Sequence, residues 1–235
     1  MHVKLTMKAR TMLQKLKIDF VSDIACPWCA IGLYGLEKAL DNLANEIDSE
    51  ISFHPFELNP DMPAGGENGL DHIARKYGMS PDQARENRAR IRNRAAEVGF
   101  TMNAADTSRA YNTFDAHRLI AWAGDKGRQI EMKRALFALY FTDQKDPGDP
   151  DALAAAAEAV GLDATEALEV LASDRYAEQV RAEESLWRER GINGVPAVIV
   201  GDRYLISGGQ PAEEFERQLR WISAKLREER APAEA

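Results

Sequence analysis

The part of the sequence best suited to chemistry is a pair of cysteines, Cys26 and Cys29, separated by two residues. Residues 18–21, before the pair, are mostly β-branched or aromatic, which predicts a short strand. After the pair, apolar residues between 31 and 40 recur at helical spacing, which predicts an amphipathic helix. The two thiols therefore lie where a strand passes into a helix, a position that suits thiol–disulfide exchange.

The expected geometry explains why these thiols would react. Cys26 falls at the N-cap of the predicted helix, where its sulfur is expected to accept hydrogen bonds from unpaired N–H groups in the field of the helix dipole. Both effects favour the thiolate and lower a cysteine pKa from about 8.5 into the range ~3.5–7.5. Pro27 suits the first helical position. Exposed Cys26 is expected to attack and the more buried Cys29, one turn on, to resolve the mixed disulfide, with Trp28 shaping the contact surface.

The other chemistry open to a cysteine pair is half of a structural zinc site. Zinc needs about four ligands, and the sequence holds only these two cysteines and four histidines. Neither a second Cys-x-x-Cys nor a His-x₃-His spacing is present. The histidines are scattered, at His2, His54, His72 and His117. The sequence therefore favours redox chemistry and predicts no metal site.

Composition excludes several functional classes. The 235 residues are 45% hydrophobic and 29% charged, as expected for a globular protein with a core. The net charge of −8 argues against nucleic acid and anionic membranes, and the arginine-rich run 85–94 fits a solvated helix face. The sequence has no apolar run of the ~18 residues that a membrane span needs. Residues 1–16 do not resemble a secretory signal, so a cytoplasmic location is expected.

The remaining periodicities predict the order of the elements. The first helix is expected to end near Asn45, and a second strand is expected at 51–58, with Pro55 marking an edge or an irregularity. Most of 69–190 has helical periodicity. The predicted helices there are 81–98, 109–125, 128–143, 151–160, 164–172 and 176–190. Strands 197–200 and 203–206 flank a Gly201-Asp202 turn, and a last helix covers 211–229.

This order of elements predicts an α/β fold. It corresponds to a thioredoxin-like βαβ–ββα core with an inserted α-helical domain. We expect a discontinuous thioredoxin-like domain at 17–66 and 191–230, and an inserted helical domain at 67–190. The first sixteen residues lie outside the core pattern, and the tail 231–235 is expected to fray.

Several motifs taken together resemble a known family. They are CPWC at 26–29, FELNPD at 56–61, NTFDAHRL at 112–119, GINGVP at 191–196 and SGGQP at 207–211. In this order they resemble the DsbA-like thiol oxidoreductases and, within them, the FrnE-like branch. The resemblance covers roughly residues 17–226.

The resemblance implies a cis peptide bond at Val195–Pro196, facing the Cys26 sulfur. In such folds the residue before the proline exposes its backbone, so a peptide substrate is expected to pair with Val195. The resemblance also implies a cavity above the disulfide, where Asn112 and His117 would contact substrate. Helical spacing suits a packing role for His117 equally well.

Two further features leave alternatives open. Ser207 and Gln210 stand just before the last helix, where they suit a cap or, alternatively, a site for a glutathione-like carboxylate. Thioredoxin-type relatives keep a buried carboxylate under the disulfide. Here the loop before the cysteines is one residue longer, so both Asp19 and Asp23 are candidates for the group that assists Cys29.

The predicted function is that of a thiol–disulfide oxidoreductase, with Cys26 as nucleophile, Cys29 resolving and Pro196 opposite. No bound cofactor is expected apart from the redox-active disulfide Cys26–Cys29. Glutathione is a possible co-substrate. The expected partners are thiol or disulfide substrates, either protein or small molecule, for a monomer or homodimer that binds neither nucleic acid nor membrane. The alternatives are a glutathione-dependent isomerase or transferase related to 2-hydroxychromene-2-carboxylate isomerase, and a non-catalytic binding module. The second cysteine argues against the isomerase.

Overall fold

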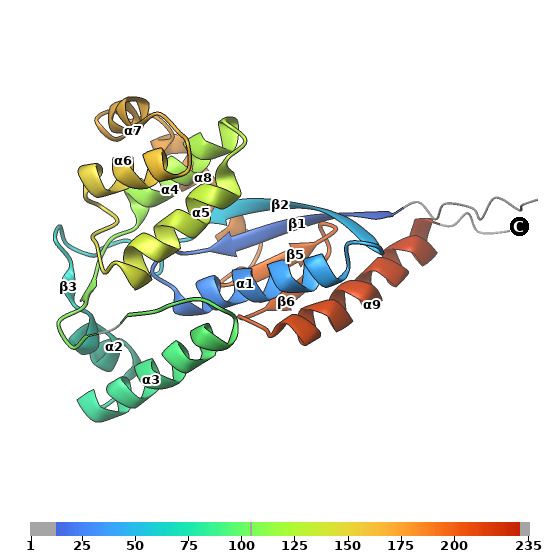
Figure 1. Cartoon of the computed structure of the whole chain (residues 1–235), viewed down its shortest axis with the longest axis horizontal. Coiled ribbons are helices and arrows are strands. Elements are labelled where there is room, and N and C mark those ends of the chain that lie inside the picture. The colour runs from blue at the N-terminus through green and yellow to red at the C-terminus, as the bar shows by residue number, and fades with distance from the viewer. Residues whose placement is uncertain (1–12, 104, 231–235) are drawn as a thin grey trace, which may run out of the picture.

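The fold is built around a four-stranded mixed sheet (Figure 1). The computed structural model describes residues 13–103 and 105–230. The strands are β1 (Gln14–Ser22), β2 (Ile47–Pro55), β5 (Ala197–Val200) and β6 (Tyr204–Ser207), in the spatial order β2-β1-β5-β6. β1 runs parallel to β2 and antiparallel to β5, and β5 pairs antiparallel with β6. The predicted βαβ–ββα order of the core is confirmed.

β1 is a central strand and carries much of the core. Its residues Ile18 and Phe20 are fully buried. Phe20 pairs in register with Phe53 of β2 on one side and with Val198 of β5 on the other. The Phe20 and Phe53 rings also meet edge to face, with their centres 5.6 Å apart. A strand covered on both faces is expected to have such a nearly continuous apolar run.

Helices cover the sheet and form a block beside it. α1 (Pro27–Asn42) and α9 (Ala212–Arg230) contact each other in front of the sheet in Figure 1. They bury Leu33 and Leu36 from α1 and Phe215 from α9. The helices between β2 and β5 are α2 (Gly69–Tyr77), α3 (Pro81–Glu97), α4 (Phe114–Asp125), α5 (Gln129–Phe137), α6 (Pro150–Ala159), α7 (Ala164–Leu171) and α8 (Ala177–Glu189).

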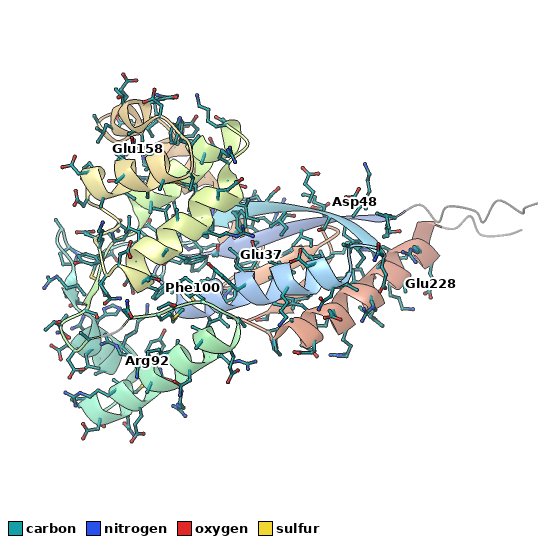
Figure 2. The ribbon with its side chains drawn as sticks, in the orientation of Figure 1. Glu37, Asp48, Arg92, Phe100, Glu158 and Glu228 are labelled. Carbon is teal, nitrogen blue, oxygen red and sulfur yellow. The ribbon has the colours of Figure 1, made fainter. Side chains whose placement is uncertain are left out.

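The helical block is joined to the sheet and to α1 by both apolar and charged contacts. α5 and α8 pack against the edge strand β2. Glu37, which Figure 2 labels between α1 and α5, pairs with Arg134 of α5 at 2.6 Å. Phe100, also labelled there, follows α3 and packs on the Tyr34 ring of α1, with ring centres 5.0 Å apart. The Glu37–Arg134 pair thus ties α5 to α1, the helix that carries the cysteines.

The largest differences between the observed elements and the predictions lie in three places. β1 begins at Gln14, with Leu16 buried, so the core starts before residue 17. The helix predicted at 109–125 begins only at Phe114, because Asn112 Oδ1 accepts a hydrogen bond from the Phe114 N–H. The preceding Arg109–Ala110 (β4) instead pairs with Glu67–Asn68 (β3) in a small sheet that the sequence did not predict.

The other boundary differences are smaller. The first helix ends at Asn42 rather than near residue 45, and the second strand spans Ile47–Pro55 rather than 51–58. The helix predicted at 128–143 consists of α5 and a π-helical turn, Ala138–Thr142. The predicted fraying of 231–235 lies outside the described residues, as do residues 1–12. Within the part of the chain that is described, no helix has the length and apolar character needed to cross a bilayer.

Candidate active site

The two cysteines lie at the start of α1. Cys26 is the N-cap with an extended backbone (φ −91°, ψ 111°), and Pro27 opens the helix, both as predicted. The Cys29 N–H donates to the Cys26 carbonyl at 3.0 Å, which places Cys29 one turn inside the helix. Both cysteines are free thiols. Proline at the first helical position and a non-helical N-cap are local features, so the sequence alone was enough to predict this turn.

The surroundings of the Cys26 thiol differ from the prediction in two respects. The Cys26 side chain is 4% exposed rather than open to solvent, and Cys29 is 0% exposed. The Cys26 sulfur accepts no capping hydrogen bond from the helix. Instead, the thiol donates to the Val195 carbonyl at 3.5 Å. The loop before β5, which lies far away in the sequence, therefore supplies the polar partner of Cys26.

That loop carries the predicted cis peptide bond between Val195 and Pro196, and it borders a groove. The Pro196 carbonyl accepts a hydrogen bond from the Gly208 N–H at 2.9 Å, which ties the loop to the end of β6. The groove has a volume of about 330 Å³. Its lining consists of residues 191–197 with Leu205, Ser207 and Gly208. Val195 thus faces Cys26 with its carbonyl and belongs to the groove wall.

The loop between β6 and α9 approaches α1 so closely that it requires glycine. A Cβ atom built on Gly209 would lie 2.5 Å from the Trp28 carbonyl oxygen, and one built on Gly32 would lie 3.1 Å from the Gly209 Cα. The Gln210 side-chain amide donates back to the Ser207 carbonyl at 2.7 Å, so both residues take part in the local turn. Ser207 also lines the groove. The SGGQP motif therefore packs directly against the turn that carries the cysteines.

Asp23 lies buried beneath the cysteine turn. Its carboxylate accepts hydrogen bonds from the Leu58 N–H at 2.7 Å, from Thr113 Oγ1 at 2.8 Å and from the Ala25 N–H at 3.1 Å. Burial by itself raises the pKa of Asp23, but His117, the Leu58 N–H and Thr113 outweigh it and hold that pKa below its usual value. Asp23 is therefore a buried anion beside the thiols.

Asp19, the other candidate carboxylate, belongs to a separate network. Its oxygens lie 2.9 Å from His54 Nε2 and 3.1 Å from Lys17 Nζ. His54 in turn reaches Glu183 of α8 at 3.0 Å through its other ring nitrogen. Burial lowers the pKa of His54, but these two carboxylates outweigh burial and raise it above its usual value. Asp19 thus links β1, β2 and α8, whereas Asp23 is the carboxylate beside the cysteines.

A family model for the DSBA-like thioredoxin domain matches residues 17–220. The chain belongs to this family. The crystal structure of a probable DsbA oxidoreductase, SCO1869, from Streptomyces coelicolor is 34% identical, with a TM-score of 0.84 over 94% of this chain and 93% of that one. The uncharacterized protein YwbO of Bacillus subtilis is 27% identical over 203 residues, which are 86% of this chain and 94% of YwbO.

Two more distant solved structures share the fold. A 2-hydroxychromene-2-carboxylate isomerase is 16% identical, with a TM-score of 0.60 over 93% of this chain and 100% of that one. The cytosolic disulfide reductase DsbM from Pseudomonas aeruginosa with GSH is also 16% identical, with a TM-score of 0.62 over 90% and 99%. The predicted DsbA-like family is confirmed, and the FrnE-like branch is consistent with these neighbours.

Two residues predicted to contact substrate, Asn112 and His117, make internal contacts in this DsbA-like chain. His117 of α4 is buried, with Nε2 3.5 Å from Asp23 Oδ1. The Asn112 amide donates to Glu57 Oε1 at 3.0 Å and to the Pro60 carbonyl at 3.1 Å. Neither residue lines the groove beside Val195. Trp28, by contrast, is 40% exposed beside the cysteines and remains part of the accessible surface.

A buried acidic residue, Glu57, lies next to Asp23. Burial and, after it, the charges of the Glu184 and Asp23 carboxylates raise the pKa of Glu57 to about 7. The Glu57 N–H donates to Glu184 Oε1 at 2.6 Å, so α8 closes over this side of the site. The neighbourhood of Asp23 therefore contains a carboxyl group that titrates near neutral pH.

The sequence reasoning missed one residue that acts on the cysteines, Lys133 of α5. Its side chain is fully buried on the face of α5 that also buries Met132, Leu136 and Phe137. Burial raises the pKa of the Cys29 thiol well above its usual value, the Cys26 thiol raises it further, and the charge of Lys133 opposes both. A lysine on the apolar stripe of a predicted helix was the available signal, because lysine is almost never fully buried unless it is paired.

The site offers no place for a metal ion within the described residues. Across 13–103 and 105–230, no group of three or more His, Cys, Asp or Glu side chains is arranged to hold one. A zinc site on the cysteine pair would need about two further ligands.

Proposed function

We propose that this chain is a thiol–disulfide oxidoreductase in which Cys26 attacks the substrate and Cys29 resolves the mixed disulfide. The observation that carries the proposal is the difference between the two thiols. The Cys26 thiol meets the Val195 carbonyl on the wall of the groove, whereas Cys29 is wholly buried one turn further on. A substrate bound in the groove lies against Val195, the partner of the Cys26 thiol, so Cys26 is the cysteine that it meets first and Cys29 reacts with Cys26.

The different roles of Cys26 and Cys29 define the steps of the reaction. The Cys26 thiolate attacks a substrate disulfide, forms a mixed disulfide and expels one substrate thiolate. Cys29 then loses its proton and attacks the Cys26 sulfur, which forms the internal disulfide and releases the second substrate thiolate. Both cysteine sulfurs are oxidised and both substrate sulfurs are reduced. The same steps in reverse oxidise a dithiol substrate.

Substrate is held beside Cys26 by backbone contacts. The Val195 backbone is the group against which an extended peptide would pair in the manner of a strand. Trp28, two residues after Cys26, adds an exposed apolar surface. Glutathione, which is itself a short peptide with a thiol, suits a groove of about 330 Å³. We therefore include glutathione as a co-substrate, and DsbM, which has the same fold, is a reductase whose structure contains GSH.

The proposal is tested by the reduction potential of the Cys26–Cys29 pair. The protein is equilibrated in glutathione buffers, and the internal disulfide is quantified by mass after the free thiols have been alkylated. One two-electron transition is expected. A potential near about −120 mV would mark an oxidant and one near about −270 mV a reductase. Free thiols at every buffer ratio would refute the redox function.

A glutathione-dependent isomerase is the second candidate, supported by the shared fold with 2-hydroxychromene-2-carboxylate isomerase. Cys29→Ser separates the two candidates, because an isomerase has no need of a resolving thiol. In the oxidoreductase, Cys29→Ser leaves a stable mixed disulfide between Cys26 and glutathione and abolishes turnover. Full activity of Cys29→Ser, with loss of activity in Cys26→Ser, would favour the isomerase.

A further inference from the structure

The most unusual group near the cysteines is the ammonium group of Lys133. Lys133 lies on α5, outside the strand–helix unit that carries Cys26 and Cys29. Its side chain is among the largest fully buried side chains of the molecule. Nζ lies 5.1 Å from the centre of the Phe137 ring, so one side of the amine is apolar. Burying a lysine in this way is costly and calls for an explanation.

The charges that act on Lys133 come from the cysteine turn. Cys29, Asp23 and Cys26 are the groups whose negative charge favours its protonated form, in that order. Burial outweighs all three and lowers the pKa of Lys133 to about 8. Lys133 in turn favours the thiolate of Cys29. The amine of Lys133 and the thiol of Cys29 therefore each act on the pKa of the other.

Asp23 is poorly suited to take the proton of Cys29. Its carboxylate already accepts three hydrogen bonds, from the Leu58 N–H, the Ala25 N–H and Thr113, and these stabilise the charged form. A carboxylate held in this way is a weak base. Its charge instead favours a cation at Lys133. Asp23 thus acts on Lys133 electrostatically.

A cavity gives Lys133 a route to solvent. The cavity has a volume of about 270 Å³ and lies between β2, α4, α5 and α8. Lys133, His117 and His54 line it together with Asp125 and Glu183. At about 30 Å³ per water, this volume suffices for a chain of several waters. The other titratable groups that line this cavity are thus the two histidines and the two acids.

We propose that Lys133 is the acid–base group for Cys29, a role that rests on the proposed thiol–disulfide exchange. When Cys26 carries a glutathione mixed disulfide, the neutral Lys133 amine takes the proton of the Cys29 thiol. The sulfur electron pair of Cys29 forms the bond to Cys26, the Cys26–glutathione bond breaks, and glutathione leaves as its thiolate. The Lys133 ammonium then releases its proton through the cavity, and the glutathione thiolate takes one from solvent. In the reverse direction Lys133 protonates Cys29 as it leaves.

The test follows the two steps separately. Reduced protein is mixed with excess oxidised glutathione and quenched with acid at intervals, and the mixed and internal disulfides are quantified by mass. Lys133→Met, which keeps the length and loses the amine, is expected to slow closure of the internal disulfide by about 100-fold. Formation of the mixed disulfide on Cys26 should change by less than about threefold. The exposed Lys145→Met serves as the matched control and should change neither step.

The pH profile separates a proton-transfer role from a packing role. In the wild-type protein, the closure rate is expected to rise with pH and level off near pH 8, and in Lys133→Met this inflection should move to higher pH. An unchanged closure rate and profile in Lys133→Met would overturn the proposal. If Lys133→Met does not fold, the wild-type profile decides, because closure that still accelerates above pH 9 contradicts a base that titrates near 8. Failure of the wild-type protein to form any internal disulfide would refute the oxidoreductase function itself.

Discussion

Replacing Glu57 by glutamine should stabilise the protein at alkaline pH and leave it unchanged at acid pH. Glu57 is buried beside Glu184 and Asp23, and burial together with these carboxylates raises its pKa from 4.5 to about 7. In the unfolded chain the group titrates near its ordinary value. Between pH 4.5 and 7 the folded state therefore holds more protons than the unfolded state, and the free energy of unfolding falls as the pH rises. Glu57→Gln removes this loss.

The expected size follows from the two pKa values. At 1.36 kcal/mol per pH unit, the interval between 4.5 and about 7 corresponds to about 3 kcal/mol. Local relaxation around an ionised Glu57 reduces this figure, so we expect Glu57→Gln to be more stable than wild type by about 2 kcal/mol at pH 8.5. Below pH 4.5 the two proteins should be equal. The substituted amide can still accept the hydrogen bond that Asn112 donates to Glu57, so little else changes.

Urea denaturation of both proteins in reducing buffer, at intervals from pH 4.5 to 8.5, measures this difference. The comparison isolates Glu57, because other titrating groups such as His54 and Lys133 occur in both proteins and cancel. Glu97→Gln, on an exposed position at the end of α3, is a suitable control and should follow wild type throughout. Stability curves of wild type and Glu57→Gln that stay parallel across this range would refute the assigned pKa of Glu57.

Two other predictions follow from contacts around the site. Gly209→Ala should cost about 1–3 kcal/mol and shift the reduction potential of the cysteine pair, because its Cβ would lie 2.5 Å from the Trp28 carbonyl. The control Gly194→Ala, whose Cβ meets no atom within 4 Å, should do neither, and equal melting temperatures for the two variants would contradict the argument. His54→Gln should cost about 2 kcal/mol at pH 5.5 and less at pH 8.5. The pKa of His54 is raised in the fold, so its stabilisation by Glu183 is complete below pH 6.5 and declines as the pH rises. A cost to His54→Gln that does not change with pH in urea denaturation would contradict this.

The sequence by itself determined the features that depend on neighbours in the chain. The turn at Cys26, the start of α1 at Pro27 and the β5–β6 hairpin could all be predicted, because an N-cap, a first-turn proline and a tight turn act over a few residues. The alternation of strand and helix periodicity also predicted the α/β fold. For the cis bond at Pro196, the resemblance of whole motifs was needed, since local preferences do not specify it.

Tertiary structure alone decided the surroundings of the thiols. The Cys26 sulfur meets Val195, 169 residues away in the chain, rather than the N–H groups of its own helix. The choice between Asp19 and Asp23 depended on which face of β1 and its loop meets α4. Lys133 acts on Cys29 only because α5 packs on β2 and is tied to α1 by the Arg134–Glu37 ion pair. Burial and charge at the site depend on residues that are distant in sequence, and no local pattern around the cysteines specifies which residues these are.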